Sequence, residues 1–170
     1  MLFWEPLSVP GLSAPEHSKI LGRLEAELES WNGTPFIQGL EMKGLGVDCV
    51  HFICAVLDVM YRQKRSVEIP RARYDAAMRP GGNQDVISTI RHMYPAHEII
   101  KDRRLQPGDI ALTGPSGSLA AGHVVIAGPR ENTFWHAQGR GVKVSGLNVL
   151  NTVYDVEIAA FRATNKRAWL

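Results

Sequence analysis

The chain has 170 residues, of which 45% are hydrophobic and 21% charged, values that fit one ordinary globular domain and exclude a disordered chain. Nineteen basic against seventeen acidic side chains leave a net charge of +2, which is too small to indicate a protein that binds nucleic acid or an anionic membrane. Two cysteines exclude a disulfide scaffold.

Residues 1–15 carry three prolines and are expected to form an extended N-terminal arm ahead of a single domain over residues 16–170. This segment has neither a basic start nor a useful apolar run, so we expect no secretory signal peptide and synthesis in the cytoplasm. No stretch approaches the roughly 18 apolar residues that a membrane-spanning helix needs.

Helical patterns fill the first half of the chain. Apolar residues at helical spacing predict a first helix over residues 17–31, and four glycines with a proline predict a loop over residues 33–47. A second helix should begin near Asp48, a residue type that caps helices, and run to about Arg62. Because this segment is apolar nearly all round, we expect it to be the buried central helix. A third helix is predicted after Asn83.

Short strand-like runs separated by Gly, Pro and Asn follow in the second half. The predicted strands cover residues 110–112, 122–127, 133–137, 141–144 and 153–162. Helices first and strands afterwards indicate an α+β fold, with helices packed on an antiparallel sheet.

Cys49 stands at the first turn of the predicted second helix. Unpaired N–H groups and the positive end of the helix dipole lie there, and both favour a thiolate. Cys54 lies five residues further along the same helix and projects from another face, so we expect neither a disulfide nor a metal pair and assign Cys54 to the core.

Two of the six histidines form a pair. His123 and His136 flank a predicted hairpin whose turn lies at residues 128–131, so Ala127 should pair with Asn132 and the two histidines should lie directly opposite each other on one face. Such a pair beside a cysteine suits nucleophilic catalysis, because one imidazole takes the thiol proton and the other orients it. His51 is two residues from Cys49 on the same helix, and such positions do not face each other.

A metal site is the competing interpretation of two adjacent histidines. It lacks a third ligand at a convincing spacing, and no CxxC or HxxxH pattern occurs in the sequence. We therefore expect no bound metal and no organic cofactor.

Several short blocks carry a family resemblance. They are residues 31–39 (WNGTPFIQG), 43–49 (KGLGVDC), 69–73 (IPRAR), 105–112 (LQPGDIAL), 122–128 (GHVVIAG), 134–137 (FWHA) and 141–142 (GV). In this order and spacing the sequence resembles the NlpC family of papain-like cysteine peptidases, most closely its phage-associated branch. The resemblance spans most of the chain, from about residue 31 to residue 161.

The resemblance implies a papain-like fold and hydrolysis of amide bonds in peptidoglycan stem peptides, typically next to D-γ-glutamyl residues. It assigns Cys49 as the nucleophile, His123 as the general base and His136 as the orienting residue. It also matches Asp48 to an aspartate that in relatives helps to hold the free amine of the peptide. The reaction would pass through an acyl-enzyme on Cys49.

The chain departs from the family pattern at two places. Phe36 stands where relatives usually have a tyrosine that polarises the scissile carbonyl, and Phe has no donor. Gln38 is an alternative donor to the oxyanion. Val50-His51 replaces a pair of small residues. Arg71, in the insert after the second helix, is a candidate for lining the substrate groove, although the insert could equally be a helical cover over one edge of the sheet.

Two alternatives to an active peptidase stay open from the sequence. One is a catalytically impaired structural or binding module of a phage tail, which Phe36 and His51 favour. The other is a papain-like acyltransferase, since the same residues serve several acyl-transfer reactions. The expected partners are the peptidoglycan peptide and phage tail or other delivery proteins, with no nucleic acid, and the expected destination is a virion or the cell wall.

Overall fold

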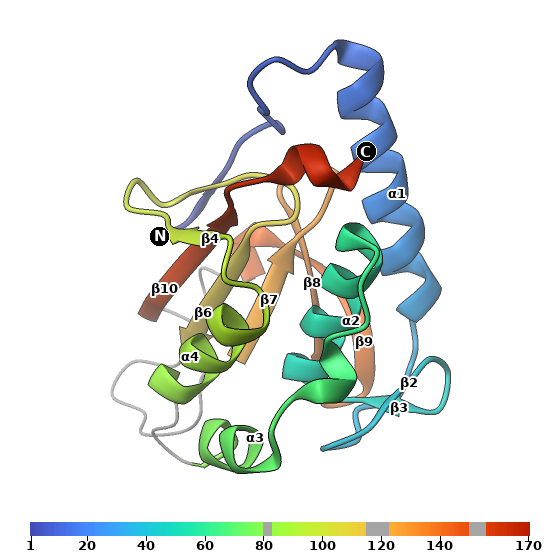
Figure 1. Ribbon diagram of the computed structural model, residues 1–170, viewed down its shortest axis with the longest axis vertical. Coiled ribbons are helices and arrows are strands. Elements are labelled where there is room, and N and C mark those ends of the chain that lie inside the picture. Colours follow the sequence, from blue (N-terminus) through green and yellow to red (C-terminus); the bar gives the residue numbers. More distant parts are fainter. Residues whose placement is uncertain (80–82, 115–122, 150–155) are drawn as a thin grey trace.

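The computed structural model describes residues 1–79, 83–114, 123–149 and 156–170 (Figure 1). It confirms the α+β class, with helices on an antiparallel sheet. The helices are α1 (Ala14–Trp31), α2 (Cys49–Tyr61), α3 (Arg71–Ala77) and α4 (Asn83–Met93), with 3₁₀ helices at Ser66–Glu68 and Lys166–Trp169. The strands are β1 (Phe3–Trp4), β2 (Glu41–Met42), β3 (Gly46–Val47), β4 (His97–Ile99), β5 (Arg104–Leu105), β6 (Ile110–Gly114), β7 (His123–Ala127), β8 (Thr133–Gln138), β9 (Gly141–Gly146) and β10 (Val156–Ala163).

The long helices follow the sequence prediction closely. α1 begins three residues earlier than predicted because Ser13 caps it: the Ser13 side chain and Glu16 satisfy each other's backbone N–H groups in a capping box. α2 begins at Cys49 with Asp48 as its N-cap, as predicted, and ends at Arg62 in the left-handed conformation. Its apolar residues are almost all buried, which confirms it as the central helix.

The main sheet has the strand order β4-β10-β6-β7-β8-β9 among the described residues, and every neighbouring pair is antiparallel. α2 packs against β7 and β8 on one face (Figure 1). Val124, Ile126 and Trp135 face this helix, whereas Val125 and Phe134 belong to a second apolar cluster on the opposite face. Successive side chains of a strand alternate between faces, so the sheet has a core on each side.

The β7–β8 hairpin differs from the predicted register. Ala127 pairs with Phe134 rather than with Asn132, because Asn132 adopts a positive φ of 55° and belongs to the turn. The register is thus shifted by two residues. Because side chains alternate with a period of two, His123 and His136 still share one face, but they lie diagonally instead of directly opposite each other. The prediction of directly opposed histidines is wrong, and that of a shared face is right.

The N-terminal arm is tied to the domain. β1 pairs in parallel with β5, and Leu2 is buried in the second apolar cluster. Gly122 and residues 153–155, which the predicted strands included, lie outside the described residues. Within the described part of the chain, no helix is both long and apolar enough to cross a bilayer.

A charged cluster lies at the start of β6. The Asp109 side chain is fully buried and accepts from Lys166 Nζ at 2.6 Å and from Arg162 at 2.8 Å. Lys166 is itself only 3% exposed. These contacts bind the C-terminal segment to the sheet, next to Trp169, whose ring covers Gly108.

Candidate functional site

Cys49 is the first residue of α2 and is 9% exposed, whereas Cys54 is completely buried. Both are free thiols. Cys54 therefore lies in the core, as predicted, and Cys49 is the cysteine at the edge of the core.

The protonation of Cys49 differs from the expectation based on its place at a helix N-terminus. Burial, together with the neighbouring Asp48 carboxylate, raises the pKa of Cys49 to about 12. Hydrogen bonds from backbone groups, Val124 among them, act in the opposite direction but are smaller. Cys49 is thus a neutral thiol at ordinary pH, because loss of solvation outweighs the helix dipole.

The two predicted histidines are in direct contact. His123 Nε2 lies 2.7 Å from His136 Nδ1, and His136 Nε2 lies 3.1 Å from Ser145 Oγ on β9. The Phe134 ring packs against His136 with a centroid separation of 5.0 Å. These contacts fix the orientation of the His136 ring, which in turn positions His123.

Both imidazoles are neutral at ordinary pH. Burial, the His136 ring and Lys143 lower the pKa of His123 to about 3. Burial and Lys143 lower the pKa of His136 to about 4. His136 is 3% exposed, while His123 is half-buried at the beginning of β7.

The cysteine and the histidines come from segments that touch. α2 packs on β7, and the backbone of Val124, the residue after His123, acts to lower the pKa of the Cys49 thiol. The start of α2 therefore meets the backbone at the start of β7. Alternation along β7 and β8 places the His123 and His136 side chains on the face of Val125 and Phe134, opposite to the face that α2 covers.

Asp48 lies at the centre of a second group of side chains. Its carboxylate is fully buried and accepts from His51 N, His51 Nδ1 and Gly39 N at 2.8 Å each and from Tyr74 Oη at 2.7 Å. Burial acts to raise the pKa of Asp48, but the hydrogen bond and charge of His51 outweigh it, and the pKa is lowered. Burial likewise acts to lower the pKa of His51, and Asp48 outweighs it, so that pKa is raised.

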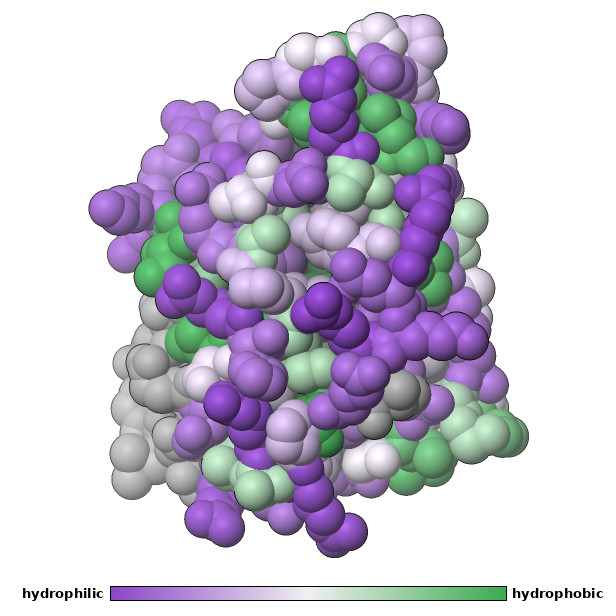
Figure 2. Space-filling view, in the orientation of Figure 1, coloured by the Kyte–Doolittle hydropathy of each residue, from purple (hydrophilic) through white to green (hydrophobic). Residues whose placement is uncertain are grey.

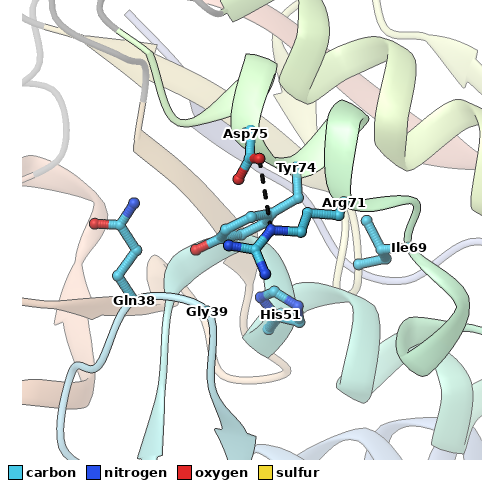
Figure 3. Close-up of a pocket in the computed structure, with 7 residues that line it drawn as sticks. All are labelled: Gln38, Gly39, His51, Ile69, Arg71, Tyr74 and Asp75. Atoms are coloured by element: carbon cyan, nitrogen blue, oxygen red, sulfur yellow. Dashed lines mark ion pairs between the residues drawn. The ribbon is translucent and has the colours of Figure 1, made fainter.

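A pocket of about 550 Å³ opens beside this group (Figure 3). Its lining residues are Gln38, Gly39, His51, Ile69, Arg71, Tyr74 and Asp75. Two predicted site residues, Gln38 and Arg71, therefore line the same pocket from opposite sides (Figure 3). His51 and the N-cap partner Asp48 connect the pocket with the first turn of α2, to which Cys49 belongs.

Phe36 does not line this pocket. It forms a bridge with Val47 and is 37% exposed, within an apolar rim around the β2–β3 hairpin. The rim also contains Ile37, Met42 and Leu45, and Figure 2 shows apolar surface over this part of the molecule. The resemblance-based role of Phe36 near the scissile carbonyl stays an expectation.

His51 and Tyr74 are the site residues that sequence reasoning did not assign. From the sequence, His51 is rejected as a base for Cys49 and is treated as a bulky departure from the family pattern, but its spacing of three from the N-cap Asp48 brings these two side chains together. Tyr74 belongs with Arg71 to the insert that the sequence offers as a groove lining, but its hydrogen bond to Asp48 is not visible in the sequence because α3 was not predicted as a helix of its own.

Among residues 1–79, 83–114, 123–149 and 156–170, no group of three or more His, Cys, Asp or Glu side chains is arranged to hold a metal ion. No known family model matches the sequence. No curated protein is significantly similar to it.

Proposed function

We propose that the chain is a cysteine hydrolase of amide bonds, with Cys49 as nucleophile, His123 as general base and His136 as the residue that orients it. The proposal includes a papain-like arrangement of α2 against the sheet. The observation that carries it is the 2.7 Å contact between His123 Nε2 and His136 Nδ1, on a strand that begins against the Cys49 end of α2.

Two placements of protons satisfy this chain of contacts, and a general-base role for His123 requires one of them. In that placement His136 Nε2–H donates to Ser145 Oγ, and His123 Nε2–H donates to His136 Nδ1. In this tautomer the lone pair of His123 is on Nδ1, which is then the atom that accepts the thiol proton. A base whose second nitrogen is held by a neighbour is the general design of nucleophile–base pairs.

The resting pair is a neutral thiol and a neutral imidazole, because burial disfavours both charged forms. Proton transfer from Cys49 to His123 accompanies attack of the sulfur on the substrate carbonyl. His123 then gives this proton to the leaving amine, an acyl-enzyme remains on Cys49, and water activated by His123 hydrolyses it. In this scheme the Cys49 backbone N–H at the helix start and the Gln38 amide serve as donors to the developing oxyanion.

The substrate class follows from the family resemblance and from the pocket. A pocket of about 550 Å³ lined by polar side chains suits a short polar peptide. We propose that the substrates are peptides of the peptidoglycan stem. A phage tail or another delivery protein would bring the enzyme to the cell wall.

The test is release of peptide fragments from purified cell-wall material and from synthetic stem peptides. Cys49→Ala should abolish release, because the nucleophile is lost. The matched control is Cys54→Ala, which removes the other thiol from the core and should retain release in the folded protein. Unchanged release by Cys49→Ala would refute the assignment.

A second candidate is a binding module of the same architecture without hydrolytic activity. The neutral, 9%-exposed thiol of Cys49 and the absence of a hydroxyl at Phe36 favour it. Stem peptides would then bind the wild-type chain and remain intact over a long incubation, whereas a hydrolase converts them.

A further inference from the structure

Two basic side chains, His51 and Arg71, border the pocket next to Asp48. Figure 3 shows the Arg71 guanidinium extending over the Tyr74 ring, toward the space that His51 also borders. Arg71 comes from the start of α3 and His51 from the first turn of α2, so the two groups meet from elements that are separate in the sequence.

His51 is held with one nitrogen outward. Its Nδ1 is bound to Asp48 Oδ2 at 2.8 Å, and its ring packs on Tyr74 with centroids 4.9 Å apart. The side chain is 14% exposed, and the exposed part borders the pocket. The Asp48 carboxylate behind it keeps the pKa of His51 above its ordinary value, which favours the form with a proton on Nε2.

The buried Asp48 is itself unsuited to binding a substrate amine. Its carboxylate is 0% exposed and already accepts four hydrogen bonds from His51, Gly39 and Tyr74. An ammonium group would have to displace one of these donors, at a cost that an exposed carboxylate does not incur. His51 lines the pocket, whereas the buried Asp48 does not.

The remaining charge at the pocket is Asp75, one helical turn after Arg71. Its carboxylate lies 3.7 Å from Arg71 Nε, and both side chains are largely exposed. Such an exposed pair is weak and leaves the outer guanidinium nitrogens available for a second acceptor. The Gln38 amide adds a further donor on the opposite wall.

We infer that this pocket binds a carboxylate of the substrate, held between His51 Nε2–H and the Arg71 guanidinium, and so selects acidic peptides instead of peptides with a free amine. The inference deepens the proposed function and rests on it for the class of substrate. In a γ-glutamyl peptide the acidic group next to the scissile amide is the α-carboxylate of the glutamyl residue.

The test measures binding to the full chain carrying Cys49→Ala, so that no hydrolysis interferes. The probes are L-alanyl-γ-D-glutamyl-L-lysine, its analogue with the glutamyl α-carboxylate converted to a carboxamide, and its N-acetylated analogue. Amidation should raise the Kd roughly 10- to 100-fold, the effect of losing a hydrogen bond to a charged group. Acetylation of the amine should change the Kd less than about threefold on the same scale.

Variants assign the effect to the two basic groups. His51→Gln or Arg71→Gln should reduce the preference for the carboxylate to within about threefold. The matched control is Arg73→Gln, on the same helix, whose guanidinium bonds Ser88 and which should keep the full preference. Because Arg71 is 93% exposed, its replacement leaves the fold intact.

The outcomes separate this inference from the proposed function. Binding that depends on the free amine and ignores amidation would overturn the inference, as would the absence of binding by all three peptides. Hydrolysis by the wild-type chain at equal rates for acid and carboxamide would overturn it while leaving the Cys49 assignment in place. Carboxylate-selective binding without hydrolysis would support the inference and count against the hydrolase.

Discussion

The Cys49 thiol should react slowly with iodoacetamide when no substrate is bound. Alkylation proceeds through the thiolate. A pKa of about 12 in place of the ordinary 9.0 lowers the thiolate population at neutral pH. Three pH units correspond to about a thousandfold, so the rate at pH 7.5 should be roughly 10³ lower than that of an exposed cysteine. The 9% exposure of the residue slows the reaction further.

The assay follows alkylation by mass spectrometry in the Cys54→Ala variant, in which Cys49 is the only remaining thiol. Between pH 6 and pH 10 the rate should rise about tenfold per pH unit, because only the thiolate fraction changes. Cys49→Ala should abolish labelling in a parallel sample. A rate that is already fast at pH 6 and constant up to pH 9 would show a preformed thiolate–imidazolium pair and refute the reasoning from burial.

Three further predictions concern the oxyanion, the C-terminal segment and the histidine pair. Phe36→Tyr should raise kcat on stem peptides by up to roughly 10²–10³-fold, since one oxyanion donor has an effect of this order; an unchanged kcat would mean that other groups supply the donor. Asp109→Asn should lower the free energy of unfolding in urea by about 3–5 kcal/mol, because it leaves the buried Lys166 charge unpaired; a loss below about 1 kcal/mol would contradict this account. The folded-state pKa of His136 is lowered from 6.5 to about 4, so the unfolded state takes up a proton first and stability falls as the pH drops from 6.5 to about 4. His136→Gln should make urea unfolding less dependent on pH in this window, by up to about 1.4 kcal/mol per pH unit, and parallel pH profiles would exclude the effect.

The central helix was predictable because several local signals agree. Asp48 is a strong N-cap residue, the following residues are apolar, and the chain after Arg62 turns polar. The agreement of capping, periodicity and composition sets both ends of α2 and therefore places Cys49 at a helix start. The protonation of Cys49 was not predictable in the same way, because it depends on burial by β7 and on the Asp48 carboxylate.

The hairpin shows the limit of register prediction. Glycine and proline at residues 128–129 mark the turn, but the actual turn extends to Asn132 with its positive φ. Because alternation has a period of two, the error left the faces of His123 and His136 correct and changed only their position along the strands.

The pocket depended on contacts that local patterns do not carry. α3 is a helix of seven residues without a clear apolar stripe, and it places Arg71 and Tyr74 against the start of α2. Gln38 and Arg71 were named from the sequence as site residues, but their meeting at one pocket with His51 and Tyr74 was not visible there. Assignments that need packing between distant segments therefore require the structure.

The position of β10 has a consequence for synthesis of the protein. This strand comes last in the chain, yet it lies in the sheet between β4 and β6. Until translation has passed residue 163, β6 has an unpaired edge, and bare strand edges are the templates on which nascent chains associate with one another. Expression at reduced temperature, or with chaperones that hold the nascent chain, should therefore increase the soluble yield more than changes to the core would.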